Sequence, residues 1–213
     1  MDENKITPQQ SMAIITAMIE NSKHRMAVSD LRISLMWASV SIATAIAVYI
    51  AQFVSANPWC HVLWAAIPVV GIPLRVILSK KNDCRKAAAK TFVDTVSDGV
   101  WKTVGYLGLA GSVVCFVFNI CGYPQAWIAM LLYAFVVVGL GAVVRGILLR
   151  ESSYVVGGLF SVVSGGLVTI VAICGIPLLS VWVIPLYVVC FSMMFIVPAF
   201  VIYKKLKKEN ERA

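Results

Sequence analysis

Six long apolar stretches, separated by short turns or charged segments, make up most of the chain. They cover residues 33–54, 60–78, 100–121, 125–149, 154–174 and 179–203. Each stretch is long enough to cross a hydrocarbon core of about 30 Å as a helix. A helix satisfies its own backbone hydrogen bonds in lipid, so we expect an all-α fold, a polytopic bundle of six transmembrane helices.

The composition agrees with a membrane environment. Hydrophobic residues make up 60% of the chain and charged residues only 13%, about half the share that is typical of a soluble domain. The net charge of +8 does not predict a nucleic-acid partner, because the charges sit at the ends of spans and in one set of loops. Their expected partners are anionic lipid headgroups, each worth about 1 kcal/mol near the surface.

The positions of the charges predict the topology. All 18 Lys and Arg and all 10 Asp and Glu fall in residues 1–32, 75–102, 145–151 and 204–213. With an even number of spans, these segments lie on one side, and the positive-inside rule makes that side cytoplasmic. We therefore expect a membrane protein with a cytoplasmic segment 1–32, a membrane domain 33–203, a basic tail 204–213 and both termini inside.

Three uncharged turns around Pro58, Pro124 and Pro177 divide the six stretches into three hairpins, because proline ends one helix and favours the start of the next. The second and third turns both read Ile-Cys-Gly-x-Pro, and Trp127 and Trp182 follow them. The similarity predicts a hairpin repeat whose tryptophans anchor at the outer interface.

Two polar segments are candidates for protein contacts. Residues 1–32 show apolar positions at three- and four-residue steps, the pattern of an amphipathic helix. That helix would lie on the cytoplasmic leaflet or dock to another protein. A second helix is expected at 84–101, running into the third span. The candidate surface for a cytoplasmic protein partner comprises Ile15, Met18, Ile19, Phe92 and Asp94.

Small residues recur at four-residue steps on two spans. One stripe contains Ser39, Ala43 and Ala47, and the other contains Gly157, Ser161 and Gly165. Such stripes let helix backbones approach closely. Two interpretations stay open: the stripes pack helices together, within one chain or in a homo-oligomer, or they line a path for a substrate.

Groups for catalysis or metal binding are not apparent in the spans. Arg75, Lys102 and Arg145 lie near cytoplasmic ends, where long side chains reach the headgroups. The six cysteines form no Cys-x-x-Cys pattern; Cys121 and Cys174 are either free thiols or partners in a disulfide. We therefore expect no cofactor, no metal and no enzymatic activity.

Several short pieces of the chain match a known pattern: residues 11–23, Trp37, residues 91–94, Trp101 and the Gly157–Gly158 pair. In these pieces the chain resembles a family of uncharacterised bacterial six-span membrane proteins, often encoded beside small DNA-binding regulators. The resemblance implies a bacterial inner-membrane protein with a regulatory or stress-linked role, and it supplies no reaction.

Two hypotheses for function follow. The first is a non-enzymatic scaffold or regulatory subunit that offers its cytoplasmic helices to a partner. The alternative is a small carrier or channel for an uncharged or zwitterionic solute. A carrier needs a polar cavity that reaches the middle of the membrane, whereas a scaffold can be a fully packed bundle.

Overall fold

The computed structural model describes residues 8–55, 57–83, 92–176 and 182–211. The described elements are helices of three kinds: α-helices, two 3₁₀ segments (η1 and η2) and one π-helical turn (η3). In chain order they are α1 (Pro8–Ser55), η1 (Pro58–Ala65), α2 (Ala66–Asp83), α3 (Phe92–Ile120), η2 (Pro124–Ala126), α4 (Trp127–Leu149), α5 (Ser152–Ile173), α6 (Val183–Phe191), η3 (Ser192–Ile196) and α7 (Val197–Asn210).

Six helical segments among these residues are long and apolar enough to cross a membrane. They run over Leu31–Ser55, Trp59–Leu78, Thr95–Ile120, Pro124–Leu149, Ser152–Ile173 and Val183–Lys205. The predicted all-α bundle of six spans is confirmed, and the protein is a multi-pass membrane protein. The sixth span consists of α6, η3 and the first part of α7 in succession.

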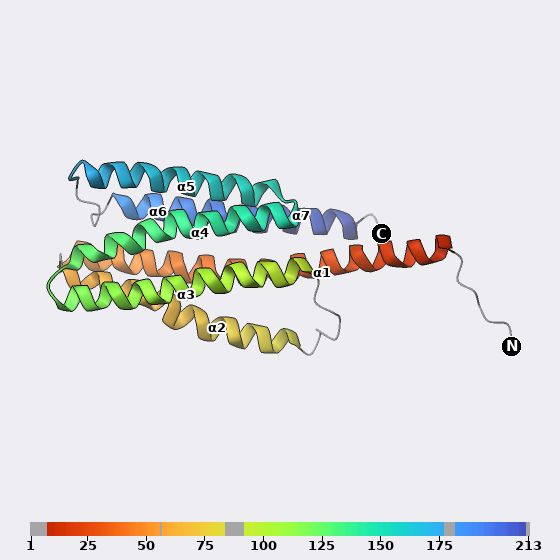
Figure 1. The fold of residues 1–213 in the computed structure, drawn as a ribbon, viewed down its shortest axis with the longest axis horizontal. Coiled ribbons are helices and arrows are strands. Elements are labelled where there is room, and N and C mark those ends of the chain that lie inside the picture. Colours follow the sequence, from red (N-terminus) through yellow and green to blue (C-terminus); the bar gives the residue numbers. More distant parts are fainter. Residues whose placement is uncertain (1–7, 56, 84–91, 177–181, 212–213) are drawn as a thin grey trace.

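The ends of the helices that carry the charged segments lie together (Figure 1). The start of α1, the end of α2, the start of α3, the turn between α4 and α5, and the end of α7 all point the same way. This grouping is what the distribution of charge along the sequence predicts. Which side of the membrane this end faces stays a prediction.

The first helix is continuous across the expected boundary at residue 32. α1 begins at Pro8, well before the first span begins at Leu31, and its first part projects beyond the bundle (Figure 1). At 1.5 Å per residue the projecting part is about 35 Å long. The predicted cytoplasmic helix likewise continues without a break into the third span from Phe92 onward, whereas residues 84–91 lie outside the described part.

Helix α5 packs most extensively on α4, its neighbour across the charged turn. A Cβ on Gly158 would stand 2.6 Å from the carbonyl oxygen of Gly139, and one on Gly165 would stand 2.7 Å from a methyl group of Val136. The hydroxyl of Ser161 donates to the carbonyl oxygen of Phe135 at 2.9 Å. Close backbone approach and an interhelical hydrogen bond thus join α4 and α5.

Helix α2 diverges from α3 toward the charged end (Figure 1). Pro73 lies inside α2, where it cannot donate the hydrogen bond of a regular helix turn, and such a position favours a bend. The spans of α2 and α3 are also the least buried, with 11% and 17% of their most apolar windows buried inside the bundle. This side is the most open part of the fold.

Candidate functional site

A cavity of about 630 Å³ lies inside the bundle between α1, α2, α3, α4 and the sixth span. Its volume is in the range of about 300–1,000 Å³ that is typical of sites for drug-sized ligands. Most of its wall is aromatic or aliphatic, with a few hydroxyl and charged groups. The bundle is therefore not fully packed.

The cavity runs along the membrane normal. On α3 its wall extends from Ser97 to Ser112, which corresponds to about 22 Å at the helical rise of 1.5 Å per residue. That length exceeds half of a hydrocarbon core of about 30 Å. The cavity therefore reaches from the charged end of the bundle past the middle of the membrane.

The cavity opens sideways between α2 and α3. Ile72 of α2 and Tyr106 and Leu109 of α3 line it, yet they are 43%, 72% and 43% exposed on the outside of the bundle. Residues that are both lining and exposed mark the rim of an opening. Because the rim belongs to two membrane spans, the opening faces lipid.

Five aromatic side chains follow one another along the cavity; we call them the aromatic row. Ring centroids are 5.0 Å apart from Trp64 to Tyr187, 4.3 Å from Tyr187 to Phe191, 5.7 Å from Phe191 to Phe195 and 5.8 Å from Phe195 to Trp101. These separations are close to or within the range of favourable aromatic pairs. The row presents a continuous apolar wall at membrane depth.

The π-helical turn η3 keeps this row aligned. Tyr187, Phe191 and Phe195 are four residues apart, a spacing that drifts around a regular α-helix of 3.6 residues per turn. The wider turn at Ser192–Ile196 rotates less per residue and brings Phe195 back to the side of Phe191. The bulging backbone of Met193 is accommodated by Gly157 of α5, because a Cβ there would overlap the Met193 carbonyl oxygen.

Arg145 lies inside the bundle at the charged end of the cavity. Its side chain is 5% exposed and donates from Nη1 to Ser34 Oγ at 3.0 Å. The guanidinium lies 5.1 Å from the ring centroid of Tyr154 and 5.9 Å from that of Trp101, and the Ser34 and Tyr154 hydroxyls are 3.2 Å apart. The expectation that Arg145 reaches out to the headgroups is wrong, because its partners on α1, α3 and α5 hold it inward.

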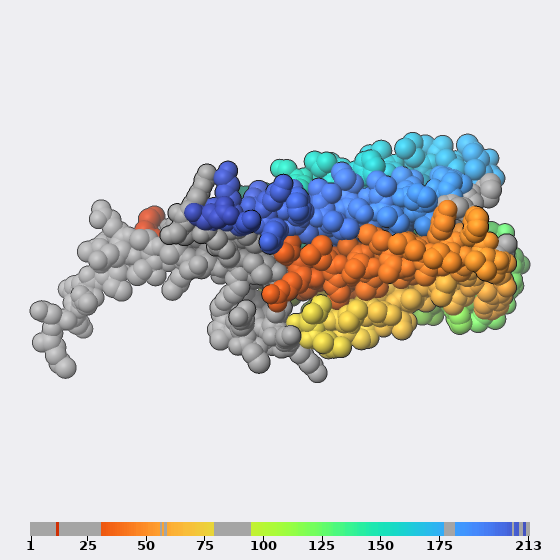
Figure 2. All heavy atoms as spheres, turned by 180° about the vertical axis from the view of Figure 1, so that it is seen from behind, coloured from red at the N-terminus to blue at the C-terminus, as the bar shows by residue number. Residues whose placement is uncertain are grey.

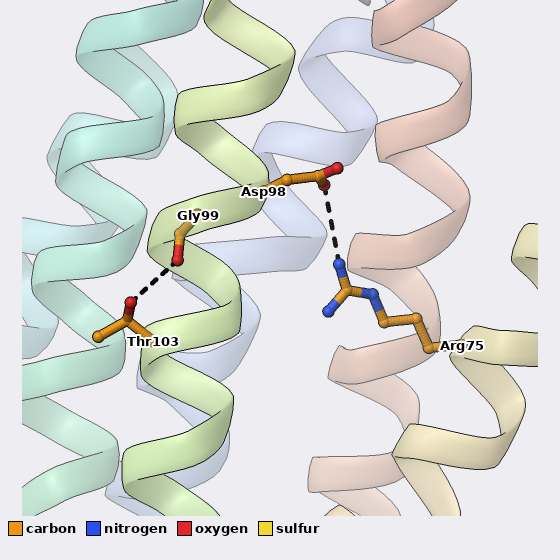
Figure 3. A network of polar contacts seen from close by, with 4 residues as sticks. All are labelled: Arg75, Asp98, Gly99 and Thr103. Atoms are coloured by element: carbon orange, nitrogen blue, oxygen red, sulfur yellow. Dashed lines mark hydrogen bonds and ion pairs between the residues drawn. The ribbon is translucent and has the colours of Figure 1, made fainter.

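Two further basic side chains line the cavity near this end. Arg75 of α2 lies 3.7 Å from a carboxylate oxygen of Asp98 on α3, so an ion pair spans the two helices that flank the opening (Figure 3). Lys102, one turn further along α3, also lines the cavity. We call Arg75, Lys102 and Arg145 the basic end; among the described lining residues they face one acidic group, Asp98.

The two predicted stripes of small residues differ in position. The stripe on α5, which contains Gly157, Ser161 and Gly165, is buried against α4 and η3. The stripe on α1, which contains Ser39, Ala43 and Ala47, is exposed. Helix α1 runs along the surface between α2 and the sixth span (Figure 2). Neither stripe appears in the cavity wall.

The candidate partner residues lie on the helices predicted for them. Ile15, Met18 and Ile19 belong to the projecting part of α1, and Phe92 and Asp94 to the first turn of α3. Their side chains are outside the described part of the structure. The partner surface therefore stays a prediction.

The outer turns share their geometry but not their tryptophans. Gly122 and Gly175 have positive φ angles of 91° and 76°, and each ends its helix with the paired hydrogen bonds of a Schellman motif. Trp182 is exposed, but Trp127 is 1% exposed and lines the cavity, so the prediction of an interfacial anchor is wrong for Trp127. The hairpin repeat itself stays a prediction.

The described part of the chain also contains five cysteines and a polar pair near the outer end. Cys121 and Cys174 are free and exposed at the outer turns, and Cys60, Cys115 and Cys190 are free and buried. The Nε2 atoms of Gln52 and His61 are 3.0 Å apart near the outer end. No group of three His, Cys, Asp or Glu side chains suited to a metal ion occurs in the described ranges.

No protein family, no curated protein sequence and no solved structure matches this chain. The site must therefore be interpreted from its own geometry. Reasoning from the sequence did not identify the cavity or the aromatic row. The four-residue spacing of Tyr187, Phe191 and Phe195 is the signal that could have indicated one aromatic face on the sixth span.

Proposed function

We propose that this protein is a membrane carrier that binds an amphipathic molecule in the cavity between α2 and α3. The observation that carries the proposal is the cavity itself, about 630 Å³ in volume and open sideways at membrane depth. The proposal assigns no chemical reaction to the protein. The proposed ligand is amphipathic, unlike the uncharged or zwitterionic solute of the alternative hypothesis from sequence. The reason is that the cavity wall is mainly aromatic or aliphatic and its charged groups lie at one end.

A substitution that fills the cavity tests this function. Gly105 lines the cavity, and a Cβ built on it meets no atom within 4 Å. Leucine at this position therefore occupies ligand space without a clash, and it favours the helix by up to about 1 kcal/mol over glycine. The matched control is Gly166→Leu, because Gly166 is exposed on α5 and its Cβ position is also open.

The measurement is native mass spectrometry of protein purified in a mild detergent. We expect a bound small molecule on the wild type and on Gly166→Leu, and its loss from Gly105→Leu. The same ligand occupancy on Gly105→Leu would contradict binding in this cavity. A wild-type protein without any retained small molecule, even after native lipids are added back, would also contradict it.

A regulatory role is the second candidate, and the projecting part of α1 supports it. A helix that extends about 35 Å beyond its span offers a surface to a cytoplasmic protein, to anionic headgroups or to a second copy of the chain. In this arrangement the protein is an inner-membrane regulatory subunit with both termini in the cytoplasm. Crosslinking and mass spectrometry of native membranes test it: a stoichiometric partner should disappear when residues 1–30 are deleted. Purification of the full chain alone would contradict it.

A further inference from the structure

We infer that the cavity takes up one long hydrocarbon chain, which lies along the aromatic row with its polar end at the charged end of the bundle. The inference rests on the proposed carrier function and names the chemistry of the bound molecule. The chain belongs either to a single-chain lipid or to a two-chain lipid that leaves its second chain in the bilayer. The wall, the volume and the opening of the cavity support the inference.

The aromatic row offers the chain a continuous apolar surface. All five of its rings line the cavity. The row leads from Trp64, near the outer end of the second span, to Trp101, near the charged end of the third. A chain that lies along the row contacts aromatic rings over most of its length, and the dispersion energy of such contacts adds up.

Hydroxyl groups near the middle of the cavity are already hydrogen-bonded within the protein. Ser112 Oγ donates at 2.8 Å to a backbone carbonyl oxygen of its own helix, and the Tyr133 hydroxyl donates to another carbonyl oxygen of α3. The hydroxyls of Ser41 and Tyr187 bond to each other. A polar group that is buried without a hydrogen-bond partner costs about 2–7 kcal/mol. The middle of the cavity therefore favours hydrocarbon over a polar solute.

The volume of the cavity matches one chain. A methylene group takes up about 30 Å³, close to the share of one water molecule in the liquid, so a cavity of about 630 Å³ holds about 20 such groups. This volume extends for about 22 Å along α3. One chain of about 16–18 carbon atoms with a small polar end fits the space, whereas two such chains exceed it.

The ends of the cavity determine the direction of the chain. Charged side chains of both signs, Arg75 and Asp98 among them, line the charged end, and burial of charges against hydrocarbon is unfavourable whatever their sign. Ile72, Tyr106 and Leu109 form the rim of the opening. A chain therefore enters sideways from lipid without leaving an apolar environment, while its polar end stays at the level of the headgroups.

Quenching of tryptophan fluorescence by a brominated chain tests the inference. Trp59 and Trp182 are exposed, so Trp59→Phe/Trp182→Phe protein keeps the four tryptophans that line the cavity: Trp37, Trp64, Trp101 and Trp127. This protein is titrated in a neutral detergent with brominated octadecanol, whose head group carries no charge. We expect saturable quenching that Gly105→Leu abolishes and that the control Gly166→Leu leaves unchanged.

The position of bromine on the chain tests its direction. Bromine near the hydroxyl end should quench Trp101, and bromine near the other end should quench Trp64. Trp101→Phe should therefore remove more of the quenching by the first probe, and Trp64→Phe more of that by the second. The reverse result would overturn the direction of the chain, and equal effects of both substitutions on both probes would overturn its placement along the aromatic row.

Two further probes distinguish the alternatives. Brominated cholesterol is amphipathic but rigid; if it alone gave saturable quenching, and Gly105→Leu abolished that quenching, the chain would be refuted and the carrier function kept. No saturable quenching by any probe would overturn both. A phosphatidylcholine brominated on one chain identifies the source: quenching as strong as by octadecanol supports a two-chain lipid, and quenching by octadecanol alone supports a single-chain lipid.

Discussion

Gly157→Ala should destabilise the protein because α5 lies against the backbone of the π-helical turn. A Cβ at residue 157 would overlap the carbonyl oxygen of Met193 and would stand 2.7 Å from its carbonyl carbon and 3.1 Å from the Cα of Met194. All three atoms are backbone, so no side-chain rotation can relieve the overlap. Either α5 or the π-helical turn must move.

The magnitude follows from two opposing effects. Overpacking of a filled interior costs about 1–3 kcal/mol, and the backbone contact puts this position at the upper end. Alanine favours a helix over glycine by about 0.5–1 kcal/mol. We therefore expect a net loss of about 2 kcal/mol in the free energy of unfolding, which lowers Tm by about 4–8 °C for a chain of this size.

Gly166→Ala is the matched control on the same helix. Gly166 is exposed, and a Cβ there meets nothing within 4 Å, so only the helix preference acts and Tm should rise by about 1–4 °C. Unfolding can be followed with a thiol-reactive dye, because Cys60, Cys115 and Cys190 are buried, in a background where the other three cysteines are serine. Equal Tm values for the two variants would refute the close contact between α5 and η3.

Three further predictions concern local contacts and topology. Ser161→Ala removes a hydrogen bond to Phe135 that is worth about 0.6 kcal/mol within a membrane, so Tm in the dye assay should fall by about 1–2 °C; a fall as large as that of Gly157→Ala would contradict this ranking. Asn57→Ala removes the side-chain cap on the Trp59 amide and should cost about 1 kcal/mol; an unchanged Tm would show that the cap adds nothing. In intact spheroplasts, an impermeant maleimide should label Cys121 and Cys174, which are exposed at the outer turns, and should spare Cys84; labelling of Cys84 would reverse the proposed orientation.

Hydrophobic length and charge placement were sufficient to predict the membrane architecture. Both signals depend on one sequence segment at a time: a span needs about 20 apolar residues, and a charged loop needs only its own composition. The predicted stretches 33–54 and 60–78 differ by no more than two residues at either end from the helices at Leu31–Ser55 and Trp59–Leu78. The sixth stretch begins later than predicted, at Val183, and residues 179–181 lie outside the described part.

The direction in which a side chain points was harder to predict, because it depends on neighbouring helices. Arg145 has the sequence position of a residue that reaches the headgroups, yet Ser34, Trp101 and Tyr154 hold it inside. Trp127 follows an outer turn as an interfacial anchor would, yet it is buried in the cavity wall. Each outcome depends on contacts between residues distant in the chain.

The cavity depends on local departures from regular helix packing. Pro73 lies in the helix that diverges, and the π-helical turn at Ser192–Ile196 aligns the aromatic row. A π-helical turn has no strong sequence signature of its own. The glycine that accommodates it, Gly157, was predicted only as part of a stripe of small residues.

The position of a bound chain is the most direct test of the central claim. Crystals of the protein grown with brominated stearic acid would give anomalous scattering from the bromine atoms. The account predicts bromine peaks inside the cavity beside Phe191 and Phe195. Bromine peaks confined to the outer surface of the bundle, with the cavity free of the lipid, would contradict it.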